Sequence, residues 1–168
     1  MTVAAFENFL ESYEKDVFTF CKYLATDYNT ACDLYQETAL AAFEMIERID
    51  AAQNPKSFMF SIAVGKWKNY RRKQQRRQII APEITLEEWS GGKNLDNPTS
   101  EMVENALMRK QLHSAINGLP DKLRIPLILH YFDDCRVEDI GIILEIPAGT
   151  AKSRLHKARA ILKEVLQK

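Results

Sequence analysis

The stretch VEDIGIILEIPAGTAKSRLHKARAIL, residues 137–162, decides how the rest of the chain is interpreted. Its first eight residues predict a short helix with one aliphatic face, made of Val137, Ile140, Ile143 and Leu144. Residues 146–149 include a proline and a glycine and predict a tight turn. We expect Thr150 to cap a last helix that runs to the C-terminus. A short helix, a turn and a basic helix in this order predict a helix-turn-helix.

The last helix has two contrasting faces. Its apolar stripe, which would seat it on its neighbour, is Ala151, Leu155, Ala158, Leu162 and Val165. The opposite side carries Lys152, Ser153, His156, Lys157 and Ala160, with Arg154 and Arg159 on the flanks. Lysine, serine and histidine can bond base edges, and flanking arginines can hold phosphates. Taken alone, the helix also fits an amphipathic surface helix whose basic residues suit its dipole.

The chain of 168 residues has no net charge, yet its charges are strongly segregated. Residues 1–50 hold ten acids and three bases, whereas residues 66–77 hold seven bases and no acid. Residues 82–105 hold six acids and one base, and residues 150–168 hold six bases and one acid. Two basic stretches separated by an acidic one raise the expectation of nucleic-acid binding.

Helical periodicity dominates and no stretch alternates as a strand does, so we predict an all-α fold of two small helical domains. Helices are expected over residues 3–24, 30–49, 55–77, 100–117, 120–134, 137–144 and 150–168. We expect one domain at 1–78, an acidic flexible linker at 79–104 that contains Trp89, and a second domain at 105–168. Pro126 should kink its helix or mark the true start of that helix.

The expected helix at 30–49 has an apolar inward face: Leu34, Tyr35, Thr38, Ala42, Met45, Ile46 and Ile49. Its outward face also carries two apolar side chains, Leu40 and Phe43, ringed by acids. That composition fits a protein interface with a basic partner better than a surface in plain solvent. A core helix with a slightly different register is the alternative.

The segment NPKSFMFSIAVGKWKNYRRKQQRR, residues 54–77, combines an exposed loop over residues 50–58 with a helix that bears cations beside aromatic side chains. Asn54 is expected to cap this helix, with Pro55 at its first position. The inward stripe is predicted to be Phe60, Ala63, Val64 and Trp67. Cations can hold a nucleic-acid backbone, and aromatic rings can stack on unpaired bases.

The string GTAKSRLHKARAIL, together with LPDKLRIPLILHYFDD at residues 119–134, closely resembles the DNA-binding region four of extracytoplasmic-function (ECF) sigma factors. These are small promoter-specificity subunits of bacterial RNA polymerase. DLYQETALAAFEMI at residues 33–46 resembles the polymerase-binding segment of that family, and residues 54–77 resemble its promoter −10 region. The resemblance covers about residues 6–78 and 105–167. It implies core RNA polymerase and promoter DNA as partners and an anti-sigma factor as regulator.

The resemblance also assigns roles to residues. The last helix would bind the −35 element through Thr150, Lys152, Ser153, Arg154, His156, Lys157 and Arg159. The −10 element would be bound in and beside the loop by Asn54, Lys56, Ser57 and Phe58, and along the helix by Lys66, Lys68, Asn69, Arg71, Arg72 and Lys73. Polymerase would be bound by Asp33, Gln36, Glu37, Leu40 and Phe43.

Five positions depart from the usual family pattern. Phe58 stands where tryptophan is common, Gly65 where asparagine is common and Asn69 where aspartate is common, which affects the expected duplex-opening contacts. His156 and Lys157 replace the aromatic residue and arginine often found at those recognition positions, so the −35 preference is open.

Other classes of function find little support in the sequence. The three cysteines form no CxxC pair, the histidines are scattered, and we expect no disulfide, metal or cofactor. No phosphate-binding loop or catalytic set is present, so we expect no enzyme. No signal peptide or membrane segment is expected, which predicts a cytoplasmic protein without membrane insertion. A stand-alone helix-turn-helix regulator and a helical adaptor that binds only proteins remain the alternatives.

Overall fold

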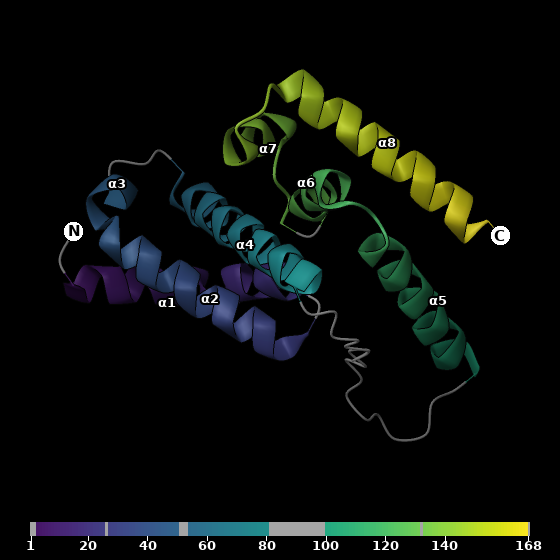
Figure 1. The fold of residues 1–168 in the computed structure, drawn as a ribbon, viewed down its shortest axis with the longest axis horizontal. Coiled ribbons are helices and arrows are strands. Elements are labelled where there is room, and N and C mark those ends of the chain that lie inside the picture. The colour runs from purple at the N-terminus through teal and green to yellow at the C-terminus, as the bar shows by residue number, and fades with distance from the viewer. Residues whose placement is uncertain (1–2, 26, 51–53, 81–99, 132, 168) are drawn as a thin grey trace. The chain divides into compact units, whose positions relative to one another are not determined.

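The computed structural model describes residues 3–25, 27–50, 54–80, 100–131 and 133–167. Every regular element in these ranges is an α-helix, which confirms the predicted all-α class (Figure 1). The chain divides into two compact units whose main boundary falls between residues 89 and 90. The first unit contains α1 (Val3–Leu24), α2 (Tyr28–Glu44), α3 (Ile46–Asp50) and α4 (Pro55–Ile80). The second contains α5 (Ser100–Asn117), α6 (Asp121–Tyr131), α8 (Ala148–Leu166) and the greater part of α7 (Val137–Leu144).

The first unit packs its three long helices, α1, α2 and α4, against one another (Figure 1). Aromatic rings lie in its core. The rings of Phe20 on α1 and Phe60 on α4 lie 4.7 Å apart between centroids, and both side chains are fully buried. The predicted inward stripe of α4, Phe60, Ala63, Val64 and Trp67, is confirmed, because all four side chains are buried. Beyond Trp67 this helix buries no further side chain among its described residues, so its basic second half lies at the surface.

Asn54 caps α4 as predicted. Its side-chain Oδ1 accepts a hydrogen bond from the Ser57 amide at 3.1 Å, and its carbonyl accepts one from the Phe58 amide at 3.1 Å. Pro55 occupies the first helical position, where a missing N–H group costs no hydrogen bond. The helix therefore begins where the sequence indicates, and it continues to Ile80, three residues beyond the expected end.

The expected single helix at 30–49 is wrong in its continuity and in its start. Asp27 caps α2, since its carboxylate accepts the Thr30 amide at 2.8 Å, and the helix begins at Tyr28. It ends at Glu44, and the amide of Met45 bonds back to the carbonyls at residues 41–43. The chain then turns into the short α3. Of the expected inward side chains, Leu34, Thr38, Ala42 and Ile49 are buried, whereas Tyr35, Met45 and Ile46 are half-buried.

The second unit has its own aliphatic core, formed by Ile116, Leu119, Leu123, Leu127 and Ala158, with Ile161 and Leu162 packed against it. Both α5 and α6 pack against α8. The first turn of α6 is closed by the carbonyl of Pro120, which accepts the amides of Leu123 and Arg124 at 2.8 and 2.9 Å. The helix begins at Asp121, so Pro126 lies inside it and does not mark its start.

Residues 79–80 and 100–104 belong to α4 and α5. The remaining part of the expected linker, residues 81–99 with Trp89, lies outside the described residues. The three cysteines form no disulfide in the structure. Among the described residues, no helix is long and apolar enough to cross a membrane, and no group of three potential metal ligands is present.

Candidate nucleic-acid and protein interfaces

The turn between α7 and α8 is tight, and it depends on Gly141. The Gly141 carbonyl accepts the Ile146 amide at 2.9 Å, and a Cβ atom at position 141 would lie only 2.9 Å from the Ile146 carbonyl oxygen. Glu145 lies between them with a φ of 55°, in the left-handed region that favours glycine. The predicted helix-turn-helix is therefore present. Its turn places the side chain of Glu145 in a backbone conformation that strains most residues other than glycine.

Thr150 does not cap the last helix, contrary to the expectation from the sequence. Helix α8 begins at Ala148, and its N-cap is Pro147, which makes no side-chain cap hydrogen bond. The Pro147 carbonyl accepts the amides of Thr150 and Ala151 at 2.9 and 3.0 Å. Proline at the cap brings residues 148–150 into the first turn, so Thr150 lies half-buried within the helix.

The two faces of α8 are confirmed over its first three turns. Ala151, Leu155 and Ala158 are buried, and Leu162 is half-buried against the core of the unit. The opposite side and one flank are exposed: Lys152, Ser153, His156, Lys157, Ala160 and Arg159. Arg154, on the other flank, is half-buried. Val165 was expected in the apolar stripe, but it is 51% exposed. The packed core ends near Leu162, so the last turn of α8 extends beyond it.

A second basic surface lies along α4. Lys68, Asn69, Arg71, Arg72 and Lys73 are exposed, and Lys66 is half-buried. The Arg71 guanidinium lies 5.8 Å from the centroid of the buried Trp67 ring, and that ring stacks on Tyr70 at 5.5 Å. A Cβ atom at Gly65 would meet nothing within 4 Å, so packing in the unit does not require glycine there.

An ion pair that could not be predicted from the sequence holds the first turn of α4 to α1. Lys56 Nζ lies 2.7 Å from an Asp16 carboxylate oxygen and 5.5 Å from the centroid of the Phe60 ring. Lys56, Ser57 and Phe58 were expected in or beside a loop over residues 50–58, but all three belong to the helix and are half-buried. Residues 51–53 of that expected loop lie outside the described residues.

The outward face of α2 carries the predicted acid-ringed apolar patch. Leu40 is 62% exposed and Phe43 is 43% exposed, and Asp33, Gln36 and Glu37 are exposed on the same helix. This exposure rules out the alternative of a core helix in a different register. The Phe43 ring also packs edge-to-face against the buried Phe6 of α1, with 5.4 Å between ring centroids. A protein partner could cover this patch without rearranging the core.

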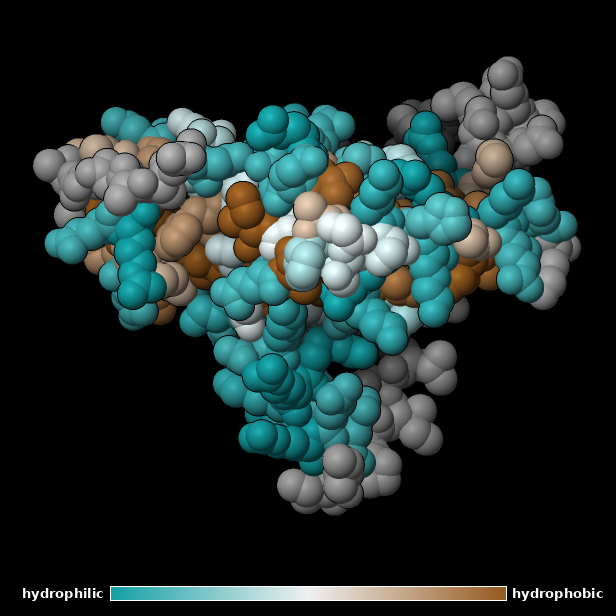
Figure 2. Space-filling view, turned by 90° about the horizontal axis from the view of Figure 1, so that it is seen from above, coloured by the Kyte–Doolittle hydropathy of each residue, from teal (hydrophilic) through white to brown (hydrophobic). Residues whose placement is uncertain are grey.

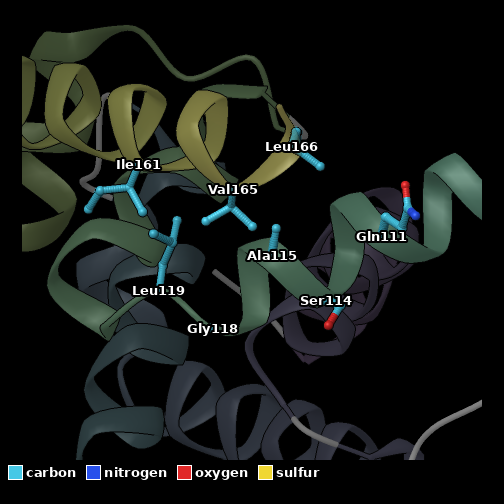
Figure 3. A pocket seen from close by; sticks show the side chains of 8 residues that line it. All are labelled: Gln111, Ser114, Ala115, Gly118, Leu119, Ile161, Val165 and Leu166. Atoms are coloured by element: carbon cyan, nitrogen blue, oxygen red, sulfur yellow. The ribbon is translucent and has the colours of Figure 1, made fainter. Parts of the chain in front are cut away.

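A further apolar surface, which the sequence reasoning missed, lies between α5 and α8. A cavity of about 480 Å³ is lined by Gln111, Ser114, Ala115, Gly118, Leu119, Ile161, Val165 and Leu166. Figure 3 shows Leu119 and Val165 pointing into this groove, the latter from α8. Exposed apolar side chains on α5, Leu107, Met108 and Leu112, extend the apolar surface of that helix. Their spacing along α5 is the signal that could have indicated it.

On the face seen in Figure 2, hydrophobic residues gather in patches within a largely hydrophilic covering. Large apolar side chains exposed in one region are the usual mark of a binding surface. The patch on α2 and the groove between α5 and α8 are therefore candidate protein interfaces.

One histidine in the second unit has a shifted pKa. Partial burial lowers the pKa of His113, and the positive charge of Arg124 lowers it further. Arg124 is itself buried and donates to an Asp121 carboxylate oxygen at 2.8 Å. The side-chain amide of Asn117 donates to His113 Nδ1 at 3.1 Å, a bond that requires this nitrogen to be unprotonated. Partial burial, the Arg124 charge and the hydrogen bond from Asn117 all favour the neutral form of His113 at the α5–α6 corner.

Comparison with protein families matches both units. Residues 9–77 match the model of sigma-70 region 2, and residues 109–162 match that of sigma-70 region 4. These two ranges contain the patch on α2, the basic surface of α4 and the exposed polar face of α8.

Individual proteins agree with the family models. The chain is 26% identical to the ECF RNA polymerase sigma factor SigW of Bacillus subtilis, over 97% of this chain and 89% of that protein. It is 30% identical to the ECF RNA polymerase sigma-E factor of Haemophilus influenzae, over 83% of this chain and 76% of that protein.

Solved structures show the same fold. The sigma factor RpoE of Bartonella quintana, crystallised in complex with the anti-sigma factor NepR, matches with a TM-score of 0.81 at 23% identity, covering 98% of both chains. CnrH, solved in complex with the cytosolic domain of CnrY, matches with a TM-score of 0.68 at 16% identity, covering 99% of this chain and 90% of that one.

The chain belongs to the family of ECF RNA polymerase sigma factors. It is accordingly a factor for transcription initiation that works with RNA polymerase at promoters, and this result does not favour a stand-alone helix-turn-helix regulator.

Proposed function

We propose that this sigma factor binds the promoter through two separate basic helices. The exposed face of α8 reads the −35 element, and α4 with the segment before it engages the −10 element. The observation that carries this proposal is the recognition face of α8: Lys152, Ser153, His156 and Lys157 are all exposed, while Ala151, Leu155 and Ala158 opposite them are fully packed. A helix seated in this way can enter a major groove without disturbing the unit that carries it.

At the −10 element, the exposed cations of α4 hold the nucleic-acid backbone. The part of α4 beyond the core carries three exposed cations, Arg71, Arg72 and Lys73, which can contact phosphates. Lys56 and Phe58 belong to the first helical turn of α4. The helix therefore fixes their backbone positions, as an open loop would not. Lys56 is engaged by Asp16, so it orients this turn and contributes less charge to DNA than the lysines farther along α4.

Core polymerase binds at the outward face of α2. Leu40 and Phe43 form the apolar centre of this interface, and Asp33, Gln36 and Glu37 form its polar rim toward a basic partner. The groove between α5 and α8 provides the second polymerase contact, since the DNA-binding unit must also be held on the enzyme. Two contacts on one chain strengthen each other through effective concentration, and so do the two DNA-binding helices.

An anti-sigma factor regulates the chain by covering these apolar surfaces. The patch on α2 and the groove between α5 and α8 are exposed in the free chain, and a regulator that binds them excludes polymerase. The similar RpoE of Bartonella quintana was solved with the anti-sigma factor NepR, which supports this mode of control. The factor acts in the cytoplasm, where the polymerase is, and it positions DNA while the polymerase performs the chemistry.

The test is initiation by core polymerase reconstituted with the full chain, with transcript starts sequenced from a promoter library. We expect starts downstream of two shared sequence elements. Leu40→Asp should abolish this transcription, and Tyr28→Asp is the matched control, because Tyr28 is 55% exposed at the other end of the same helix. Polymerase binding without transcription would favour a polymerase-binding adaptor, and tight duplex binding by the free chain would favour an independent regulator.

A further inference from the structure

An exposed aromatic ring lies beside the recognition helix. Tyr131, the last residue of α6, is 53% exposed, and the Arg159 guanidinium of α8 lies 5.4 Å from the centroid of its ring. We propose that Tyr131 is a positioning residue that holds Arg159 ready to bind the DNA backbone beside the −35 element. This inference rests on the proposed role of α8 in reading that element.

The ring of Tyr131 is itself held in place. The His130 ring packs edge-to-face against it, with 5.0 Å between ring centroids. His130 Nδ1 donates to the Cys135 carbonyl at 3.0 Å, and the Cys135 amide donates to the Leu129 carbonyl at 2.9 Å. Cys135 is buried. The end of α6 is thus tied to the chain that leads into α7, and Tyr131 offers Arg159 a fixed surface.

An aromatic face suits a phosphate-binding arginine better than a carboxylate would. A carboxylate partner would occupy the N–H donors of the guanidinium and cancel its charge. A ring attracts the cation through its π face and leaves the N–H donors in the guanidinium plane available. A free arginine side chain must lose rotamer freedom when it binds phosphate, and stacking on Tyr131 removes part of that cost before DNA arrives.

Lys157 and Arg159 have different roles in this proposal: Lys157 contacts bases and Arg159 contacts the phosphate backbone. Both are exposed on α8, and Arg159 is the one that lies over an aromatic ring. Lys157 belongs to the face opposite the buried stripe, where a flexible side chain can adapt to different bases. Arg159, on the flank, needs one defined direction because a backbone phosphate has the same position in every sequence.

The experiment measures promoter affinity of the reconstituted polymerase carrying wild-type chain, Tyr131→Leu, Tyr131→Phe, Arg159→Met or Tyr131→Leu with Arg159→Met. Loss of the ring should weaken binding about two- to fivefold, the range of an exposed cation–π contact. Tyr131→Phe should bind as wild type does, because it keeps the ring. In the Arg159→Met background, Tyr131→Leu should have no further effect. Both single losses should be equal across different −35 sequences, and Arg159→Met, which removes the charge, should also lower the salt dependence of binding.

Three results would overturn the proposal: an unchanged affinity for Tyr131→Leu, an effect of Tyr131→Leu that persists without Arg159, or a Tyr131→Phe variant as weak as Tyr131→Leu. The last result would show that the hydroxyl, and not the ring, makes the contact. Thermal melting verifies that each variant is folded, and Tyr131→Gln serves as a second ring-less variant if Tyr131→Leu unfolds. Failure of the wild-type chain to support initiation would instead overturn the proposed function, and this inference with it.

Discussion

Phe43 of α2 packs edge-to-face on Phe6 of α1, with 5.4 Å between ring centroids, and still leaves 43% of its surface exposed. Phe6 itself is buried. Part of the Phe43 ring therefore packs on the core of the first unit, and the rest is exposed in the outward patch that also contains Leu40. The two residues of the patch should respond differently to substitution.

Leu40→Asp should abolish binding to core polymerase without a significant loss of stability, because the 62% exposed side chain contributes little to the core. Phe43→Asp should also abolish binding, but it should lower the free energy of unfolding as well, by about 1 kcal/mol or more, since the aromatic pair is lost. Pull-down with core polymerase measures the first effect and chemical denaturation the second. Unfolding of the Leu40→Asp chain would show that this residue serves the core.

Lys152→Ala and Lys157→Ala should change promoter choice at individual −35 positions. Each lysine is exposed on the face opposite the buried stripe of α8, where a side chain can bond base edges. The expected cost is about 1–3 kcal/mol at the affected position. Transcription from a library of −35 variants measures it. A drop of equal size on all promoters would identify these lysines as phosphate contacts.

Glu145→Gly should stabilise the turn between α7 and α8 by about 1 kcal/mol. Glu145 has a φ of 55°, and glycine adopts this conformation without the penalty that a Cβ atom brings. Gly141→Ala should do the reverse, because its Cβ atom would lie 2.9 Å from the Ile146 carbonyl oxygen. Thermal melting of the two variants tests both expectations. A stabilised Gly141→Ala variant would contradict the tight turn described above.

Stability of the second unit should fall as the pH is lowered below about 6.5, the ordinary pKa of histidine, toward the lowered pKa of His113 in the folded chain. The pKa of His113 is lowered in the folded chain by burial and by Arg124, so the unfolded chain binds more protons in this window. Protonation would also remove the hydrogen bond from Asn117. His113→Gln should show a smaller loss of stability across the same window in pH-dependent denaturation. An equal loss in both chains would assign the effect to other groups.

The local parts of the fold could be predicted from the sequence, because they follow from periodicity and caps. The stripe at Phe60, Ala63, Val64 and Trp67 and the cap at Asn54 depend on near neighbours alone. The break at Met45 could not be seen, since apolar residues continue across it with helical spacing. Thr150 was expected as a cap because it follows the predicted turn over residues 146–149, whereas the helix begins at Ala148, inside that turn.

The contacts between distant residues lay beyond the sequence. Asp16 and Lys56 are forty residues apart, and only the packing of α1 on α4 brings them to 2.7 Å. Arg159 was recognised as a flanking cation, but its place over Tyr131 depends on how α6 meets α8. Val165 was assigned to the core by its spacing, and the groove between α5 and α8 shows why it is exposed: the core ends one turn earlier.

The central claim is that one chain holds two separate promoter elements for a polymerase that it also binds. The most direct measurement is a footprint of the reconstituted polymerase on a promoter taken from the transcript-start library. We predict protection over both the −35 and the −10 elements, with the −35 protection selectively lost in the Lys152→Ala, Lys157→Ala double variant. Protection that covers a single element, or that the free chain produces without polymerase, would contradict the account.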